Sequence, residues 1–244
     1  MIFELCCGST ADAVAAYEGG SPRVELNSDL FHGGLTPSIG EVRVLKKICP
    51  KLKLMCMVRP REGGFDYTDI EFETMKEDAK ALIESGADGI VFGFLNSDGT
   101  VNKARCKEMM EIIGNKESVF HRAIDVTPNW KEAMDILIEL GVTRILTSGQ
   151  KPTVPEGVFT IKEMIDYAAG RIEIQPGGGI TPENAAWVKE MTGAKMMHAA
   201  VLRTAFDHST SANPAITYGG CFYPPEDRYS VSHKDDVADF IKRL

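Results

Sequence analysis

The sequence predicts an α/β protein built as one closed (β/α)8 barrel. Short β-rich runs and helix-patterned stretches alternate along the chain, and such alternation is typical of a parallel sheet. Eight of these pairs in 244 residues leave about 30 residues for each, which is the size of a βα unit. No linker or low-complexity segment divides the chain, so we expect one domain over residues 1–244. A doubly wound parallel sheet is the alternative architecture.

Each element is predicted from its local pattern. Short apolar runs rich in β-branched or aromatic residues indicate strands, and apolar residues at helical spacing indicate helices. The predicted strands are 2–7, 23–27, 53–58, 89–93, 119–122, 144–147, 171–175 and 195–198. The predicted helices are 10–19, 37–48, 70–85, 102–113, 130–140, 160–169 and 182–192, with a final helix near 234–243.

Thr-Pro pairs are interpreted as helix starts, because Thr is a good N-cap residue and Pro suits the first helical position. The pairs are Thr36-Pro37, Thr127-Pro128 and Thr181-Pro182. Two connections, 59–69 and 199–233, are too long for simple turns, and long irregular segments in compact domains are often functional. Because 199–233 is rich in Tyr and Phe, we expect this irregular C-terminal segment to cover a barrel face or to make a subunit contact.

Composition excludes several classes of function. The formal net charge of −8 argues against a general binder of nucleic acid or of anionic membranes. The longest apolar runs fall far short of the roughly 20 residues that span a bilayer. The six cysteines lack the C-x-x-C spacing of zinc sites, and the N-terminus has no secretory pattern, so we expect reduced thiols and a cytoplasmic location.

Side chains alternate along a strand, and in a barrel one of the two faces must be apolar because it meets the helices. In 23–27 the valine and leucine must face the helices, so Glu25 and Asn27 point into the lumen. The same argument places Glu4 and Cys6 of the first strand in the lumen. Further inward positions are Met55, Met57, Arg59, Arg61, Glu173 and Gln175. In the fifth strand the parity that carries His121 and Asp125 is left open.

Ionisable groups are unusual in a barrel lumen, because an unpaired buried charge costs several kcal/mol, in order of magnitude. Six of them are expected toward the C-terminal strand ends, where barrel sites are built: Glu4, Glu25, Arg59, Arg61, His121 and Asp125. Neighbouring cations can give two carboxylates different pKa values, so that one acts as a general acid and the other as a general base. A histidine can act as either. The catalytic candidates are therefore Glu4, Glu25, His121 and Asp125, with Arg59 and Arg61 as anion-binding residues and His198 as a weaker acid–base candidate. A salt-bridge network closing the barrel is the alternative interpretation.

Glycine-rich turns at the same rim favour anion binding. Gly177, Gly178 and Gly179 follow the seventh strand and lead into a predicted helix start, where backbone amides can approach an anion. Ser148 and Gly149 after the sixth strand add hydroxyl and amide donors. For a metal, Cys6 is the best soft ligand in the sequence, although a single thiolate makes a poor site.

Several motifs of the chain carry a family resemblance. The motifs are ELC (4–6), RVEL (23–26), GGLTPS (33–38), MVRPREGGFDY (57–67), EFETMKEDAKALIESGADGIVFGFL (71–95), FHRAID (120–125), RILTSG (144–149) and PGGGIT (176–181). Together, in order from residue 4 to about 198, they resemble the CutC family. The resemblance implies a TIM-type barrel, a homo-oligomer, a cytoplasmic location and an association with copper homeostasis. It also implies copper ligation by a cysteine of the first-strand motif, which Cys6 matches, and by one of the second, where Asn27 stands instead.

Two hypotheses follow. In the first, the chain is a copper homeostasis protein that binds copper, with Cys6 as a ligand and Met55 or Met57 as helpers. In the alternative, it is a TIM-barrel enzyme, a lyase, isomerase or hydrolase, that acts on a small anionic or sugar-like metabolite at the C-terminal mouth of the barrel. The partner is a metal ion in the first case and a small-molecule anion in the second.

Overall fold

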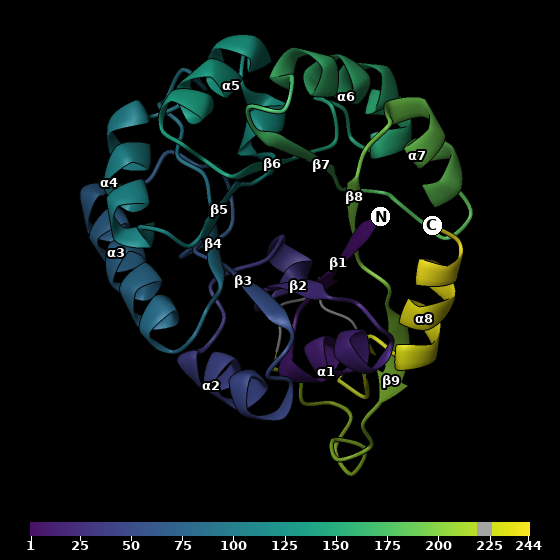
Figure 1. Ribbon diagram of the computed structural model, residues 1–244. Coiled ribbons are helices and arrows are strands. Elements are labelled where there is room, and N and C mark those ends of the chain that lie inside the picture. The colour runs from purple at the N-terminus through teal and green to yellow at the C-terminus, as the bar shows by residue number, and fades with distance from the viewer. Residues whose placement is uncertain (219–225) are drawn as a thin grey trace.

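The computed structural model describes residues 1–218 and 226–244, and it confirms the barrel. Eight parallel strands lie side by side in the order β7-β6-β5-β4-β3-β2-β1-β8, and helices surround them as an outer ring (Figure 1). The strands are β1 (Ile2–Cys7), β2 (Arg23–Leu26), β3 (Lys53–Met57), β4 (Gly89–Phe92), β5 (Glu117–Phe120), β6 (Arg144–Thr147), β7 (Glu173–Pro176) and β8 (Met196–Ala199).

The barrel closes less tightly at one seam than elsewhere. β1 pairs in parallel with both β2 and β8, and Glu4 lies opposite Arg23 on one side and His198 on the other. Between β7 and β8 the contact is reduced to one parallel bridge, Gly177 to His198. The register of β1 therefore puts an acid, an arginine and a histidine from three neighbouring strands at one level of the lumen.

The helices of the ring follow the strands in turn. They are α1 (Thr10–Glu18), α2 (Ile39–Ile48), α3 (Asp69–Glu84), α4 (Lys103–Ile113), α5 (Trp130–Glu139), α6 (Val154–Ala168), α7 (Ala185–Thr192) and α8 (Lys234–Lys242). Short 3-10 turns, η1 (Leu30–His32) and η2 (Arg122–Val126), follow β2 and β5. Among the described residues, no helix is both long and apolar enough to cross a membrane.

The start of α6 differs from the sequence-based prediction. The helix begins at Val154 rather than at residue 160, and Pro155 occupies its first turn, where no backbone hydrogen bond is lost. Gly157 allows the first turn to lie directly on the loop after β6, because a Cβ there would come within 1.9 Å of the Ser148 carbonyl oxygen. The buried stripe of α6 thus starts earlier than the apolar pattern alone suggests.

The Thr-Pro pairs were wrong as helix starts. The N-caps of α2, α5 and α7 are Ser38, Asn129 and Asn184, two or three residues after each Thr. Ser38 forms a full capping box with Glu41, and the Asn129 side-chain oxygen accepts from the amides of the first turn. Each Thr-Pro therefore belongs to the incoming loop. In α2 and α5 the next short polar side chain satisfies free amides of the helix, whereas the Asn184 side chain makes no such bond to α7.

Two apolar layers hold the barrel together. Between sheet and helices lies the main core, to which Leu5, Val24, Leu26 and Leu54 contribute, as their alternation predicts. Inside the lumen a smaller cluster fills the barrel, made of Met55, Met57, Val91, Val119 and Leu146. Val119 therefore faces inward and Phe120 outward, which settles the parity of β5.

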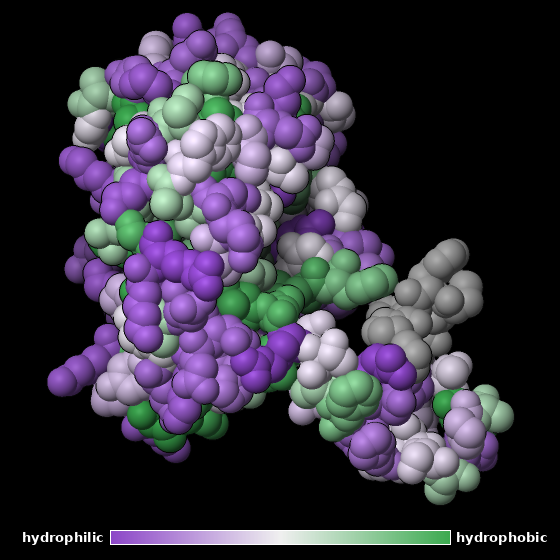
Figure 2. All heavy atoms as spheres, turned by 90° about the vertical axis from the view of Figure 1, so that its right-hand side faces the viewer, coloured by the Kyte–Doolittle hydropathy of each residue, from purple (hydrophilic) through white to green (hydrophobic). Residues whose placement is uncertain are grey.

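The segment 199–233 contains an antiparallel pair, β9 (Arg203–Phe206) and β10 (Arg228–Val231). It leaves the end of β8 and stands off the barrel rather than lying over it (Figure 2). The chain returns where the Ser232 amide donates to Asp12 at 2.6 Å, and α8 then packs on α1. Residues 219–225, with Cys221, lie outside the described residues. That this segment makes a subunit contact stays a prediction.

Candidate functional site

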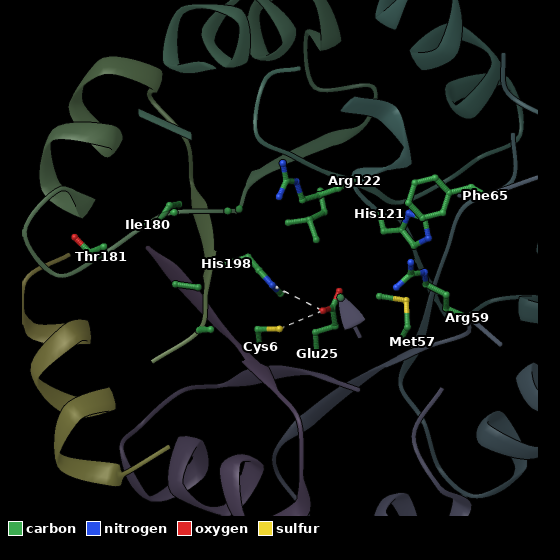
Figure 3. Close-up of a pocket in the computed structure, with 17 residues that line it drawn as sticks. Cys6, Glu25, Met57, Arg59, Phe65, His121, Arg122, Ile180, Thr181 and His198 are labelled. Carbon is green, nitrogen blue, oxygen red and sulfur yellow. Dashed lines mark hydrogen bonds and ion pairs between the residues drawn. The ribbon is translucent and has the colours of Figure 1, made fainter. Parts of the chain in front are cut away.

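A cavity of about 600 Å³ opens at the C-terminal mouth of the barrel. Figure 3 shows its wall as a ring of side chains from several strands and the loops that follow them. The lining residues are Cys6, Glu25, Gly33, Met57, Arg59, Phe65, His121, Arg122, Leu146, Gly177, Gly178, Gly179, Ile180, Thr181, His198, Ala199 and Ala200. The predicted mouth site therefore exists, with a partly different membership.

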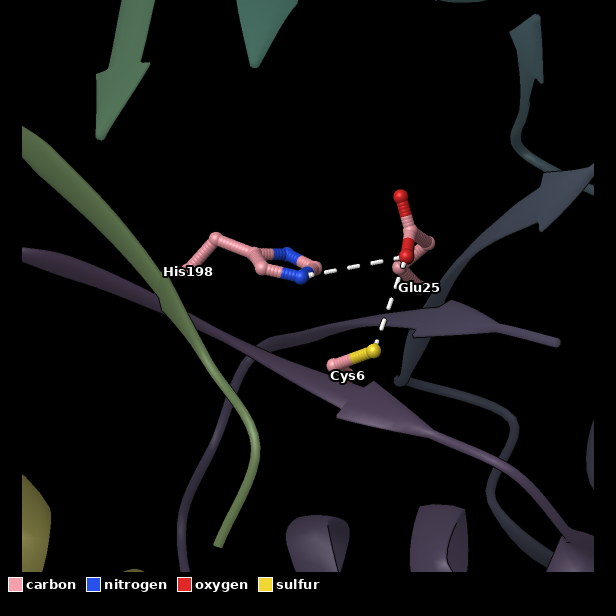
Figure 4. A group of neighbouring side chains, drawn as sticks. All are labelled: Cys6, Glu25 and His198. Atoms are coloured by element: carbon pink, nitrogen blue, oxygen red, sulfur yellow. Dashed lines mark hydrogen bonds and ion pairs between the residues drawn. The ribbon is translucent and has the colours of Figure 1, made fainter. Parts of the chain in front are cut away.

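Three potential metal ligands meet on this wall: Cys6, Glu25 and His198 (Figure 4). One ligand atom from each lies within 4.8 Å of the other two. The Cys6 Sγ donates to Glu25 Oε2 at 3.7 Å, and His198 Nε2 lies 3.8 Å from the same oxygen. β1, β2 and β8 are neighbours in the sheet, so adjacent strands supply the whole cluster.

Glu4 lies behind the cluster and fixes the orientation of His198. Its Oε1 is 2.9 Å from His198 Nδ1 and accepts from the Gln175 amide at 3.0 Å. Arg23 Nε donates to the other oxygen at 2.5 Å. Burial opposes ionisation of Glu4, but the hydrogen bond from His198 and the charge of Arg23 outweigh it and lower its pKa to about 2. Glu4 is therefore a supporting carboxylate, and it does not line the cavity.

The three cluster residues titrate abnormally. Burial favours neutral His198, yet the adjacent carboxylates Glu25 and Glu4 outweigh it and raise the pKa of the imidazole well above its usual value. Burial also raises the pKa of the Cys6 thiol and that of the Glu25 carboxyl. Without a bound ion, the His198 imidazole therefore holds a proton between Glu25 and Glu4. These carboxylates favour a positive charge at this position, whether a proton or a metal ion supplies it.

Asn27 points into the lumen as predicted and holds the cluster from the β2 side. Its amide donates to Glu25 Oε2 at 3.0 Å and reaches Cys6 Sγ at 3.7 Å. Gly34 packs against it so closely that a Cβ there would lie 2.5 Å from the Asn27 side-chain oxygen. Asn27 thus orients two candidate ligands.

His121 follows β5 directly and caps η2. Its Nδ1 accepts from the Ala123 amide at 3.1 Å, so the proton of the neutral ring is assigned to Nε2. Nε2 is buried and has no hydrogen-bond partner among the described residues. Burial, with the charge of Arg59 beside it, lowers the pKa of His121 to about 3. This histidine is therefore a neutral donor at physiological pH.

Arg59 lines the cavity, but most of its hydrogen bonds serve the backbone. Its Nη1 donates to the carbonyls of His32 and Gly34 at 3.0 and 3.1 Å, and Nη2 donates to Gly63 at 2.8 Å. The guanidinium thus ties the loop after β2 to the loop after β3. Its role as an anion clamp stays a prediction.

Arg61 was wrongly placed in the lumen. Its guanidinium pairs with Glu71 at 2.5 Å and lies over the ring of Tyr67, and it does not line the mouth cavity. The reason is that β3 ends at Met57, so strand alternation does not extend to residue 61.

Asp125, Ser148 and Gly149 also lie off the cavity wall. The Asp125 carboxylate accepts from the Thr147 hydroxyl at 2.5 Å and from the Ser148 amide at 3.0 Å. It therefore joins the turn after β5 to the loop after β6, and its oxygens are occupied. The predicted glycines Gly177, Gly178 and Gly179 do line the cavity.

Three arginines were missed as lumen or mouth residues: Arg23, Arg122 and Arg144. Arg23 has the same parity as Glu25, a signal that the sequence contains. Arg144 is 1% exposed and pairs with Glu117 at 2.6 Å and Glu173 at 3.1 Å. These partners lie at the N-terminal ends of their strands, so an ionic network lies at the closed end of the barrel.

Comparisons with known proteins agree on the family. The model of the CutC family matches residues 1–203. A CutC family protein of Treponema denticola is 52% identical over 99% of this chain and 98% of its own. A human protein named copper homeostasis protein cutC homolog is 39% identical over 89% of this chain and 80% of its own.

Solved structures give the same result. The crystal structure of the putative copper homeostasis protein CutC from Streptococcus agalactiae has a TM-score of 0.78 and 34% identity, and covers 82% of this chain and 98% of that one. An aldolase, QR15, is 18% identical with a TM-score of 0.59, covering 82% of this chain and 89% of its own, and shows the shared barrel alone. The chain belongs to the CutC family of copper homeostasis proteins.

Proposed function

We propose that this member of the CutC family binds a copper ion at the mouth of its barrel, through Cys6, Glu25 and His198. The observation that carries the proposal is the convergence of their three ligand atoms within 4.8 Å. Copper is then the cargo of a homeostasis protein rather than a resident cofactor.

The donor set fits copper. A thiolate suits Cu(I) and an imidazole suits copper in general. Glu25 Oε1 is buried and has no hydrogen-bond partner among the described residues, so it is available as a ligand or as a charge partner. Met57 lines the same cavity and offers a thioether, whereas Met55 is packed in the lumen cluster below. Glu4 on His198 Nδ1 supplies the outer hydrogen bond that metal-binding histidines usually make.

Copper binding must displace protons. His198 has to lose its Nε2 proton and Cys6 its thiol proton before either can ligate. Because both pKa values are raised, copper affinity should rise with pH through the neutral range, with proton release. Calorimetry in buffers of different ionisation enthalpy measures that release directly. Binding with no proton release would contradict the assignment of these two ligands.

An anaerobic Cu(I) titration against a competing chelator tests the site. We expect one copper per chain, with affinity lowered by roughly 10- to 100-fold or more in Cys6→Ala and in His198→Asn. Cys7→Ala is the matched control, because Cys7 is adjacent in sequence but buried on the helix side of β1. Equal binding by Cys6→Ala and Cys7→Ala would reject the proposal.

We further propose a cytoplasmic location and assembly into a homo-oligomer. Free thiols at Cys6, Cys7, Cys49, Cys56 and Cys106 are consistent with a reducing compartment. The projecting segment carries exposed Phe206, Ile216, Tyr218 and Tyr229, which supports a contact with another chain. Light scattering during size-exclusion chromatography measures the mass; a monomer at micromolar concentration would contradict the oligomer.

The alternative hypothesis, an enzyme that uses Glu4, Glu25, His121 and Asp125, has less support. Glu4 lies outside the cavity wall, and Asp125 is occupied by the loop after β6. Two of the four proposed catalytic groups therefore have no access to a substrate in the mouth cavity.

A further inference from the structure

Part of the cavity wall takes no part in the proposed copper site. It consists of Arg122 and His121 at the end of β5 and the turn Gly177-Gly178-Gly179 after β7. In Figure 3 Arg122 and His121 lie across the cavity from Cys6. Their polar groups are held in fixed positions, which is the property of a binding site rather than of a solvated surface.

Arg122 is positioned by two of its three nitrogens. Nε donates to Asp125 Oδ2 at 2.9 Å, and Nη2 donates to the Ser148 hydroxyl at 2.6 Å. Nη1 donates to no group in the described part of the chain. Asp125 and Ser148 do not line the cavity, but they fix the orientation of the guanidinium that does. The edge of the guanidinium at Nη1 is left open.

The glycine turn lies over the face of the guanidinium. A Cβ on Gly178 would stand 3.0 Å from Arg122 Nη1, 3.2 Å from Cζ and 3.6 Å from Nε, so a side chain there would crowd the guanidinium. Gly178 and Gly179 also have φ of 113° and 74°, a conformation that favours glycine. The turn thus packs on the cation with no side chain between them, and the in-plane edge at Nη1 stays free for an anionic group beside the turn.

His121 adds a neutral donor to the same wall. Its Nε2 is buried and unpartnered among the residues described, while the ring packs on Phe65 with centroids 4.7 Å apart. The ring is therefore fixed, and a buried donor without a partner is costly unless a ligand supplies the acceptor. An anion alone does not require this donor, whereas an anion that also carries a hydroxyl or carbonyl oxygen would use it.

We propose that the mouth cavity binds a small organic anion that carries a hydroxyl or carbonyl group, with the charged end at Arg122 and the Gly178 turn and the neutral oxygen at His121 Nε2. The charged group is a phosphate or a carboxylate. This site is built from residues other than the three proposed copper ligands, so it stands independently of copper.

Calorimetric titration with defined probes tests the proposal. Glycerol 3-phosphate and glycerate carry both features, inorganic phosphate lacks the hydroxyl, and glycerol lacks the charge. We expect at least one of the two complete probes to bind about tenfold or more tightly than glycerol, and the better of them identifies the charged group. If neither binds more tightly than glycerol, the proposal is overturned.

Two variants separate the role of Arg122, which binds the charged group, from that of His121, which donates to the neutral oxygen. Arg122→Gln should weaken glycerol 3-phosphate and inorganic phosphate alike, and glycerate as well, by about tenfold. His121→Phe keeps an aromatic ring against Phe65 and should weaken only the probes that carry a hydroxyl. Arg171→Gln is the matched control, since Arg171 has similar exposure to Arg122 but does not line the cavity.

Folding of each variant is checked by circular dichroism and thermal melting. Arg122→Lys keeps a positive charge in case Arg122→Gln fails to fold, and it should retain more affinity than the glutamine variant. Anion affinity that is unchanged in every Arg122 variant, or that falls equally in Arg171→Gln, would overturn the assignment. Cys6→Ala should leave anion binding intact, so a failed copper site and a failed anion site remain distinguishable.

Discussion

Both ends of the barrel lumen contain ionisable residues, but those at the closed end form more ion pairs with one another than those at the mouth. At the closed end Arg144 reaches Glu4, Glu117 and Glu173 at 3.9, 2.6 and 3.1 Å, and Arg23 also holds Glu4. Arg144 Nη1 has no hydrogen bond among the described residues, but it lies within ion-pair distance of Glu4. At the mouth, Glu25 and His121 each keep a buried atom without a hydrogen-bond partner among those residues. This contrast separates the charges that support the fold from the groups that are available to a ligand.

The physical reason lies in the cost of burial. A buried charge that is removed from its partners costs several kcal/mol, so the network at the closed end must be nearly complete to exist at all. An unpartnered buried group at the mouth carries a similar penalty in the empty protein, which a bound ion or anion relieves. Substitutions at the closed end should therefore act on stability, and substitutions at the mouth on binding.

The largest effect is expected at the closed end. Arg144→Met leaves the Glu4 and Glu117 carboxylates short of a cation, and we expect the free energy of unfolding to fall by roughly 3–5 kcal/mol. Urea denaturation measures the loss. Lys80→Met breaks only an exposed pair with Glu77 and should change little. Equal effects of the two substitutions would remove the contrast between buried and exposed pairs.

The second effect is a dependence of stability on pH. The pKa of Glu4 falls from 4.5 to about 2 in the folded protein, so folding is favoured above pH 4.5 and this contribution is lost as pH falls toward 2. The loss is on the order of 3 kcal/mol. Measured by denaturation at a series of pH values, the free energies of unfolding of the wild type and of Glu4→Gln should converge as pH falls across this range. Parallel curves would show that Glu4 is not the group responsible.

A smaller effect is expected at the mouth. Glu25→Gln removes a buried carboxylate whose Oε1 has no partner among the described residues, and the saved burial cost offsets the lost attraction to His198. The free energy of unfolding should change by less than about 1 kcal/mol at neutral pH, whereas copper affinity should fall. A destabilisation as large as that of Arg144→Met would place Glu25 in the supporting network.

The smallest effect is expected outside the lumen. Arg61→Gln breaks the pair with Glu71 and the exposed hydrogen bonds from the guanidinium to the carbonyls of the loop after β3, at Glu62, Gly64 and Asp66. Stability should change little, because the Arg61 side chain is 36% exposed and such pairs contribute little. Copper and glycerol 3-phosphate should bind as they do to the wild type. Weakened binding of either ligand would show that Arg61 takes part in the mouth site.

Much of the architecture could be predicted from local pattern. Alternation of strands and helices indicated the barrel, and side-chain parity indicated the inward orientation of Glu4, Cys6 and Glu25. Parity failed at Arg61 because it holds only within a strand, and β3 had already ended. Local pattern could not identify the N-caps either, because Thr, Ser and Asn are all good N-cap residues and lie within three positions of one another before these helices.

Fold class and the face on which each strand residue lies follow from the amino-acid order alone, because both depend on periods of two to four residues. Which of those residues meet depends on the folded barrel. His198 joins Cys6 and Glu25 because β8 pairs with β1, and Arg144 neutralises Glu117 and Glu173 across neighbouring strands. The partner of a buried charge is set by barrel closure and register, which link residues far apart in the chain, and no local pattern contains that information.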